Sequence, residues 1–278
     1  VQEQLSTRVG SDVLLCPLYG ALSLNDQRKA ILPAPDGMRK VVLATNIAET
    51  SLTIEGIRLV VDCAQERVAR FDARTGLTRL ITQRISQASM TQRAGRAGRL
   101  EPGICLHLLA KEQAERAAAQ GDPELLHSDL SGLLMELLQW GCRDPAQLTW
   151  LDLPPAVNVQ AAKRLLHMLG ALDGEQLSAI GQKMAALGND PRLAAMLVSA
   201  ATPDDAATAA KLAAILEEPP RMGNTDLGVA FSRHQPAWQQ RSQQLLKRLN
   251  VRNGEADASR IAPLLAQAFA DRIARRRS

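Results

Sequence analysis

The sequence QRAGRAGR at residues 92–99 constrains the fold and chemistry of this chain more than any other stretch. In a helix, Gln92, Arg96 and Arg99 fall at i, i+4 and i+7 and therefore share one face. The opposite face carries alanines and glycines, which let a neighbouring backbone approach closely. Interior glycines and arginines three residues apart both weaken a helix, so helix propensity does not explain the pattern. Two guanidinium groups on one face suit a polyanion such as a triphosphate, and the plainer interpretation is a solvated basic face.

Two short apolar segments indicate an open α/β sheet. Residues 39–45 read RKVVLAT, and residues 58–62 read RLVVD, the pattern of a buried strand. Ligands of such sheets bind beyond the carboxyl ends of the strands. Thr45, Asn46 and Ser51 lie in that position, although turns and helix caps also favour these residue types.

Three motifs in order resemble those of the DEAH-box RNA helicases. TNIAETSLTI at residues 45–54 is similar to their motif V, QRAGRAGR at 92–99 to motif VI, and PLYGALS at 17–23 to motif IVa. The resemblance implies a RecA-like α/β domain of the P-loop NTPase type with a parallel sheet. A mostly α-helical winged-helix and helical-bundle region is expected to follow it.

The resemblance implies three domains. We expect a second RecA-like helicase domain at residues 1–120, a winged-helix domain at 121–188 and a truncated ratchet-like helical bundle at 189–278. The turn-forming sequence Gly-Asp-Pro at 121–123 favours the first boundary. Residues 66–82 are expected to form a hairpin with residues 72–76 as its turn, at the position of the family's strand-separating wedge.

The resemblance also assigns roles around the nucleotide. It implies that Arg99 and Arg96 are arginine fingers on the γ-phosphate and that Gln92 contacts the γ-phosphate and the attacking water. Ser51 resembles the residue that relays the nucleotide state between the two sites. Arg93 points about 100° away on an ideal helix, and we interpret it as a structural ion-pair residue.

A second set of residues is expected on the RNA path. Thr45 resembles the motif V threonine whose hydroxyl and backbone meet a phosphate, and Asn46 follows it. Gly20 in motif IVa lets backbone N–H groups approach the strand closely. Arg39 and Lys40 are candidate phosphate contacts by their charge. Contacts to the phosphate backbone give affinity without sequence preference.

Three positions depart from the family pattern. Ile31 stands where many relatives have a phenylalanine that stacks on the nucleotide base. Ala64 stands where the family usually has glycine after the strand-end Asp62, and Gly188 replaces a common proline. None of these changes touches the phosphate chemistry.

Two motifs of a complete helicase are missing from these residues. The chain has no Gly-x-x-x-x-Gly-Lys-Ser/Thr phosphate loop and no DEAH or DExH sequence. In the family, both belong to the first RecA-like domain. We therefore expect a middle fragment of a longer protein, inactive alone, whose partner is the first RecA-like domain of the same protein. ATP and Mg²⁺ are the expected ligands, with Mg²⁺ held by that absent domain and no metal site in this chain.

Composition excludes several other classes. The charge of +4 permits a nucleic-acid partner, and 3% aromatic residues argue against base-stacking platforms of the RRM kind. Four cysteines without a Cys-x-x-Cys pair argue against zinc and disulfide frameworks and favour a reducing cytoplasm. No apolar run approaches the length of a membrane-spanning helix, so we expect no membrane partner.

Three hypotheses remain from the sequence. The leading hypothesis is that the chain is part of an ATP-dependent 3′ to 5′ RNA helicase that binds single-stranded nucleic acid. Only the resemblance favours RNA over DNA as that nucleic acid. The second is a passive RNA-binding or docking module whose arginines grip only nucleic-acid phosphates. The third is an inactive helicase-like scaffold, against which the intact motif at residues 92–99 argues.

Overall fold

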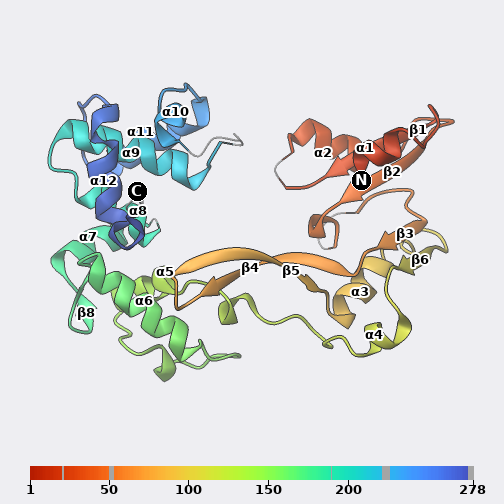
Figure 1. Cartoon of the computed structure of the whole chain (residues 1–278), viewed down its shortest axis with the longest axis horizontal. Coiled ribbons are helices and arrows are strands. Elements are labelled where there is room, and N and C mark those ends of the chain that lie inside the picture. Colours follow the sequence, from red (N-terminus) through yellow and green to blue (C-terminus); the bar gives the residue numbers. More distant parts are fainter. Residues whose placement is uncertain (21, 50–52, 189, 221–225, 275–278) are drawn as a thin grey trace. The chain divides into compact units, whose positions relative to one another are not determined.

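Parallel strand pairs organise the first half of the chain and helices organise the second half in the computed structural model (Figure 1). The structure describes residues 1–20, 22–49, 53–188, 190–220 and 226–274. It divides into two units, one of residues 1–70 and 78–124 and the other of residues 71–77 and 125–278. Each unit has a hydrophobic cluster of its own.

Strands and helices alternate along the first part of the chain. In chain order the described elements are α1 (Gln2–Ser6), β1 (Val13–Leu18), α2 (Leu24–Ile31), β2 (Arg39–Ala44), the 3₁₀ turn η1 (Asn46–Ala48), β3 (Leu59–Asp62), β4 (Gln65–Asp72), β5 (Leu77–Arg84), α3 (Gln87–Ala94), β6 (Ile104–His107) and α4 (Lys111–Glu115).

Two pairs of parallel strands confirm the predicted α/β class. β1 pairs with β2, so that residues 13–18 align with residues 39–44. β3 pairs with β6, so that residues 59–62 align with residues 104–107. Parallel neighbours need a crossover connection, and α2 and α3 lie in the two connections. The carboxyl ends of β1 and β2 therefore lie at one edge, as do those of β3 and β6.

Burial differs between the two pairs. Leu18 of β1 and Ala30 of α2 are completely buried where the helix packs on the strand. α3 packs against β3 and β6, but Leu59 and Val61 are 58% and 59% exposed. The prediction that residues 58–62 form a buried strand is therefore wrong for the face that carries Leu59 and Val61.

The predicted hairpin over residues 66–82 is confirmed. β4 and β5 form a two-stranded sheet. In the connecting turn the Asp72 carboxylate accepts hydrogen bonds from the Arg74 N–H and the Thr75 hydroxyl, both at 2.9 Å. Gly76 closes the turn with a φ of 67°, in the left-handed region that glycine adopts without strain.

Helices dominate the remaining chain. Its described elements are η2 (Glu124–Leu126), α5 (Ser131–Gln139), η3 (Pro145–Gln147), α6 (Ala156–Met168), β7 (Leu172–Asp173), β8 (Gln176–Leu177), α7 (Ala179–Leu187), α8 (Pro191–Val198), α9 (Pro203–Glu217), α10 (Leu227–Phe231), α11 (Pro236–Arg248), η4 (Ala258–Arg260), α12 (Ile261–Ala268) and η5 (Ala270–Arg272). Among the helices of the described residues, none is long and apolar enough to cross a bilayer.

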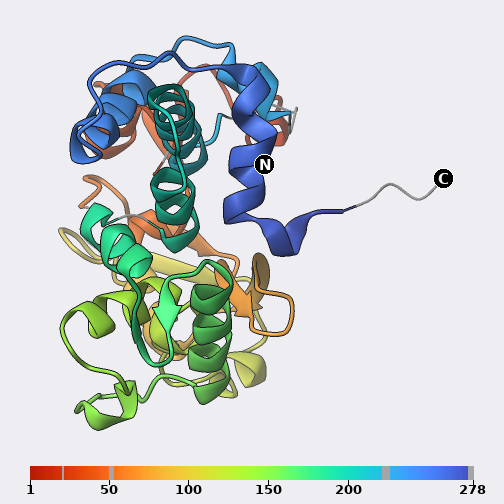
Figure 2. The same ribbon diagram turned by 90° about the vertical axis from the view of Figure 1, so that its left-hand side faces the viewer.

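The core of the second unit lies around α9. Both views show α8 to α12, coloured blue-green to blue, gathered in one bundle (Figures 1 and 2). Ala209, Ala210 and Ala213 on α9 are completely buried, and their small side chains let α8, α11 and α12 pack directly against this helix. A capping box begins α9, since Thr202 and Asp205 each accept a hydrogen bond from the other's N–H.

A short antiparallel wing separates α6 from α7. It consists of the two-residue strands β7 and β8. Gly188 ends α7 with a φ of 61°, which proline cannot adopt, so the glycine at this position has a conformational reason. The winged-helix assignment of residues 121–188 and the boundaries of the three expected domains stay predictions.

One buried ion pair ties the last helical turn of the chain to α8. The Arg192 guanidinium is bidentate to the Asp271 carboxylate at 2.7 Å, and it also donates to the Ala268 carbonyl at 2.8 Å. It also lies over the Phe269 ring, 5.4 Å from the centroid. Arg192 is 6% exposed, so loss of its partner would leave a buried charge without compensation.

We expect Asp271→Asn to destabilise the second unit by about 2 kcal/mol at pH 7. Removing one partner of a buried pair costs about 3–5 kcal/mol, and the partial exposure of Asp271 reduces that figure. All three tryptophans (Trp140, Trp150 and Trp238) lie in this unit, so tryptophan fluorescence during urea unfolding measures the change.

The same pair predicts a pH dependence. Hydrogen bonds from Arg192 hold the pKa of Asp271 below its ordinary value, against the opposing effect of burial. A lowered folded-state pKa gives stability that is present above the unfolded pKa of about 3.9 and lost as pH falls through the folded value. The difference between wild type and Asp271→Asn should therefore shrink below about pH 4. Glu175→Gln, which removes an exposed carboxylate that pairs with the half-buried Lys163, is the control, and an equal loss there would contradict the account.

Candidate functional site

The arginine motif begins in a helix and leaves it halfway. α3 ends at Ala94, and residues 95–98 continue as tight turns in which the Arg96 N–H bonds the Arg93 carbonyl and the Ala97 N–H bonds the Ala94 carbonyl. The expectation of one helix through residues 92–99 is therefore wrong. The paired glycines account for the early end, because glycine favours a helix terminus over a helix interior.

The small residues do allow a close backbone approach. Ala97 is 2% exposed, and a side chain at Gly103 would collide with the Ala97 carbonyl. The backbone at Gly103, just before β6 begins, therefore lies directly against the turn at Ala97. This contact fixes the second half of the motif against the strand pair β3–β6.

Arg96 and Arg99 both reach back to motif V. The Arg96 Nη2 donates to the main-chain carbonyl of Glu49, and the Arg99 Nη1 donates to the Thr53 hydroxyl at 2.5 Å. Burial lowers the pKa of Arg96, and the neighbouring Arg99 charge lowers it further. The two motifs lie more than forty residues apart in the chain, and the fold brings these four residues together.

Arg93 lies deeper and is held by two carboxylates. Its Nε donates to Glu49 and its Nη1 donates to Asp62, both at 2.9 Å, and its Nη1 also donates to the Gln65 carbonyl at 3.1 Å. Burial alone would lower the pKa of Arg93, but the bonds and charges of Asp62 and Glu49 outweigh it and raise the pKa. The interpretation of Arg93 as a structural ion-pair residue is confirmed by these contacts.

Asp62 lies where the two parallel strands end. It is 4% exposed and aligns with His107, whose Nδ1 is 3.1 Å from the second carboxylate oxygen. Its first oxygen also accepts from the Ala64 N–H at 3.0 Å. Ala64 has a φ of 56°, a left-handed conformation that explains why glycine is usual at this position in the family.

Sequence reasoning missed Asp62, Glu49 and His107 as parts of the site. An acidic residue that ends an apolar strand was the signal for Asp62, because ligand-facing residues gather at strand ends. Glu49 gave a weaker signal, since it lies among the polar residues of motif V. Nothing in the sequence singled out His107, which comes near Asp62 only through strand pairing.

The structure says less about the other two residues that were predicted to bind the nucleotide. Gln92 lies on α3 with its side chain exposed. Ser51 lies outside the described residues. Their proposed roles stay predictions.

The predicted RNA-binding residues fall into two groups. Thr45 and Gly20 lie at one edge, because the Thr45 N–H bonds the Leu18 carbonyl at the carboxyl ends of β1 and β2. Thr45 and Asn46 are exposed, and space is open around Gly20. Asn46 begins the η1 turn.

Arg39 and Lys40 lie at the other end of β2 and do not join this group. Arg39 pairs with Asp12 at 2.8 Å. The Lys40 ammonium donates to the Ala30 and Leu32 carbonyls at the end of α2, at 2.8 and 2.5 Å. Burial lowers the pKa of Lys40. Both cations thus have protein partners. Their roles as phosphate contacts stay predictions.

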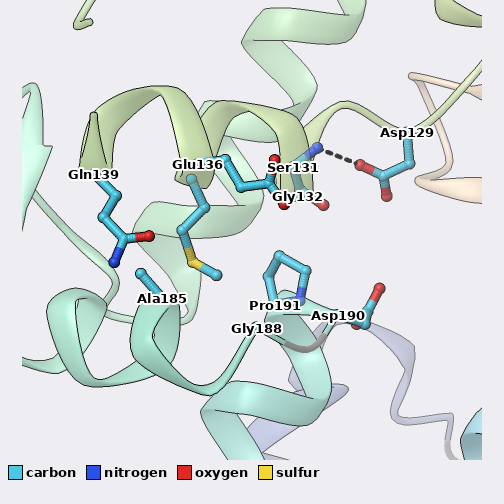
Figure 3. A pocket seen from close by; sticks show the side chains of 10 residues that line it. Asp129, Ser131, Gly132, Glu136, Gln139, Ala185, Gly188, Asp190 and Pro191 are labelled. Atoms are coloured by element: carbon cyan, nitrogen blue, oxygen red, sulfur yellow. Dashed lines mark hydrogen bonds between the residues drawn. The ribbon is translucent and has the colours of Figure 1, made fainter. Parts of the chain in front are cut away.

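A pocket of about 560 Å³ lies elsewhere, between α5 and the junction of α7 with α8 (Figure 3). Two of its acidic side chains bond main-chain N–H groups at the start of a helix: Asp129 accepts from the Ser131 N–H, and Asp190 caps α8 by accepting from the Arg192 N–H. None of the predicted site residues lines this pocket. In the described part of the chain, no group of three or more His, Cys, Asp or Glu side chains is arranged to hold a metal ion.

Comparison with known proteins identifies the family. Residues 2–101 match the helicase conserved C-terminal domain. The chain is 88% identical over 277 residues to the ATP-dependent RNA helicase HrpB of Escherichia coli, and covers 34% of that protein. It is 38% identical over 194 residues to an ATP-dependent RNA helicase HrpA homolog of Haemophilus influenzae, covering 67% of this chain and 15% of the relative.

A solved structure agrees with this result. The crystal structure of the Escherichia coli DEAH/RHA helicase HrpB matches with a TM-score of 0.97 at 88% identity, over 99% of this chain and 35% of that one. The chain thus spans about a third of the length of these HrpB relatives. The motifs, the fold and these similarities together place the chain in the DEAH/RHA helicase family.

Proposed function

We propose that this chain supplies one wall of a composite ATPase site in an ATP-dependent RNA helicase that translocates 3′ to 5′. The supporting observation is the convergence of Arg96 and Arg99 on motif V at the carboxyl ends of parallel strands. HrpB and the HrpA homolog are both named ATP-dependent RNA helicases. The proposed location is the cytoplasm, on the cysteine pattern alone.

The chemistry follows from the charges at this wall. Phosphoryl transfer to water depends on positioning and on neutralising charge at the transferred phosphoryl group. In this proposal Arg96 and Arg99 reach the γ-phosphate across a domain cleft, and Gln92 orients the attacking water. A first RecA-like domain would supply the phosphate loop and the ligands of Mg²⁺, which would neutralise phosphate charge.

The proposed RNA path uses the edge at Thr45, Asn46 and Gly20. Their exposed hydroxyl, amide and backbone N–H groups suit phosphate oxygens and do not read bases. Arg39 and Lys40 contribute only if they leave their present partners. The alternative, a passive RNA-binding module, is less favoured because the bonds of Arg96 and Arg99 described above go to Glu49 and Thr53 and not to Thr45, Asn46 or Gly20.

The first prediction concerns the 278-residue chain alone. We expect it to fold but not to hydrolyse ATP, because its sequence lacks the phosphate loop and the DExH carboxylates. Phosphate release by the purified chain is compared with a heat-denatured sample. Steady hydrolysis above that background would contradict the composite-site proposal.

The second prediction concerns the two arginines. In a full-length protein that contains this chain, Arg99→Ala and Arg96→Ala should each reduce ATP hydrolysis by at least ~10³, with RNA affinity nearly unchanged. Arg58→Ala is the matched control, because Arg58 forms an exposed pair with Glu101 in the same unit. A loss of RNA affinity as large as the loss of hydrolysis would favour the passive module.

The third prediction concerns Thr45. Thr45→Ala should weaken single-stranded RNA binding by roughly 0.5–1.5 kcal/mol for every sequence tested, because a lost hydrogen bond to a phosphate carries no sequence information. The salt dependence should stay unchanged, since the neutral hydroxyl releases no counterion. Fluorescence anisotropy measures both, with the exposed Thr7→Ala as control. Loss of basal hydrolysis with RNA stimulation intact would show that motif V was assigned to the wrong ligand.

A further inference from the structure

Glu49 is bonded through both its side chain and its backbone, and each bond goes to a different arginine of the motif. Its carboxylate accepts from the Arg93 Nε, and its carbonyl accepts from the Arg96 Nη2. The Glu49 side chain is 16% exposed. Glu49 therefore contacts both the structural arginine, Arg93, and the proposed catalytic arginine, Arg96.

Asp62 anchors this arrangement to the sheet. Its buried carboxylate is satisfied by three partners within hydrogen-bond distance, namely Arg93, the Ala64 N–H and His107. The strand pair β3–β6 fixes the Asp62 backbone, so the Arg93 guanidinium has a rigid partner. Through Arg93, the position of Glu49 is tied to the ends of two strands.

A short turn connects Glu49 to the proposed RNA edge. The Ala48 N–H bonds the Thr45 carbonyl at 3.2 Å, and the Glu49 N–H bonds the Asn46 carbonyl at 2.9 Å. Only three residues separate Thr45 from Glu49, and they form the η1 turn. The Glu49 backbone is therefore held close to Thr45 and Asn46 by this turn.

Arg96 needs a fixed acceptor such as the Glu49 carbonyl. It lies close to Arg99, a charge of the same sign, and without a fixed acceptor the two guanidinium groups would separate. A main-chain carbonyl is a suitable acceptor because it fixes the guanidinium without neutralising it, so the full charge stays available for an anion. Misplacing a catalytic group by about 1 Å costs on the order of 10²-fold in rate.

We propose that Glu49 is a positioning residue for ATP hydrolysis: held by Arg93 and Asp62, it places its carbonyl so that Arg96 faces the nucleotide. This inference rests on the proposed function, because it assumes that Arg96 acts on the γ-phosphate. It assigns Glu49 no contact with the nucleotide or with RNA. The residue acts only through Arg96.

The test uses Glu49→Ala in a full-length protein that contains this chain. We expect kcat for RNA-stimulated ATP hydrolysis to fall at least ~10-fold, with KM for ATP and RNA affinity each within about twofold of wild type. Glu101→Ala is the matched control, because it removes a carboxylate from an exposed ion pair in the same unit. That control should keep wild-type kcat, and an equal fall in both variants would overturn the proposal.

The double variant Glu49→Ala/Arg96→Ala separates positioning from a general structural effect. If Glu49 acts only through Arg96, the double variant should hydrolyse ATP no more slowly than Arg96→Ala alone. A further fall by the full Glu49→Ala factor would overturn the inference. If Arg96→Ala alone left kcat unchanged, the proposed function itself would fail, which is a distinguishable result.

Glu49→Gln keeps the proposal testable if Glu49→Ala does not fold. The amide oxygen still accepts from the Arg93 Nε but carries no charge, so kcat should fall between wild type and the alanine variant. Thermal unfolding of each variant measures its folding directly. A folded Glu49→Gln protein with unchanged kcat, in a background where Glu49→Ala is unfolded, would overturn the positioning role.

Discussion

The ion pair between Asp62 and Arg93 is the interaction on which the candidate site depends. It joins the end of β3, its neighbour β6 and the last turn of α3, and it leaves Arg93 free to hold Glu49 as well. Two carboxylates share this one guanidinium. Burying the two charges costs desolvation free energy. The clearest effect of the pair is to fix the positions of the Arg93 guanidinium and of the Glu49 side chain that it holds.

The close approach of backbones at residues 97 and 103 complements that pair. Alanine and glycine at these positions let the turn after α3 sit directly against the start of β6. Ala97 of the motif therefore has a structural reason, distinct from the chemistry of the arginines. α3 ends at Ala94 with Gly95 as its C-cap, and Arg96 and Arg99, which follow, contact motif V.

Much of the fold could be predicted from local sequence signals. The hairpin turn at residues 72–76 followed from turn chemistry and strand patterns, whereas the parallel pairing was implied by the family resemblance. The helical extent of residues 92–99 could not, because the interior glycines compete with the pattern and tertiary contacts decide the outcome. The burial of Leu59 and Val61 was misjudged because apolar character alone does not say which strand face is covered.

The site shows the same division between local and long-range information. Motif spacing pointed to Arg96 and Arg99, whereas the partners of Arg93 depend on strand register and were found only in the structure. Lys40 shows the limit most clearly, since its charge indicated a possible phosphate contact but gave no sign of its bonds to the carbonyls at the end of α2. A charge pattern predicts capacity for an interaction, but the nearest acceptor determines which interaction forms.

The most direct test of the account is a crystal structure of a full-length protein that contains this chain, bound to single-stranded RNA and a transition-state analogue of ATP hydrolysis. The account predicts the Arg96 and Arg99 guanidinium groups within about 3 Å of oxygens at the γ-phosphate position, while Arg93 remains paired with Asp62 and Glu49. Arg96 and Arg99 bound instead to RNA phosphates, and remote from the nucleotide, would contradict it.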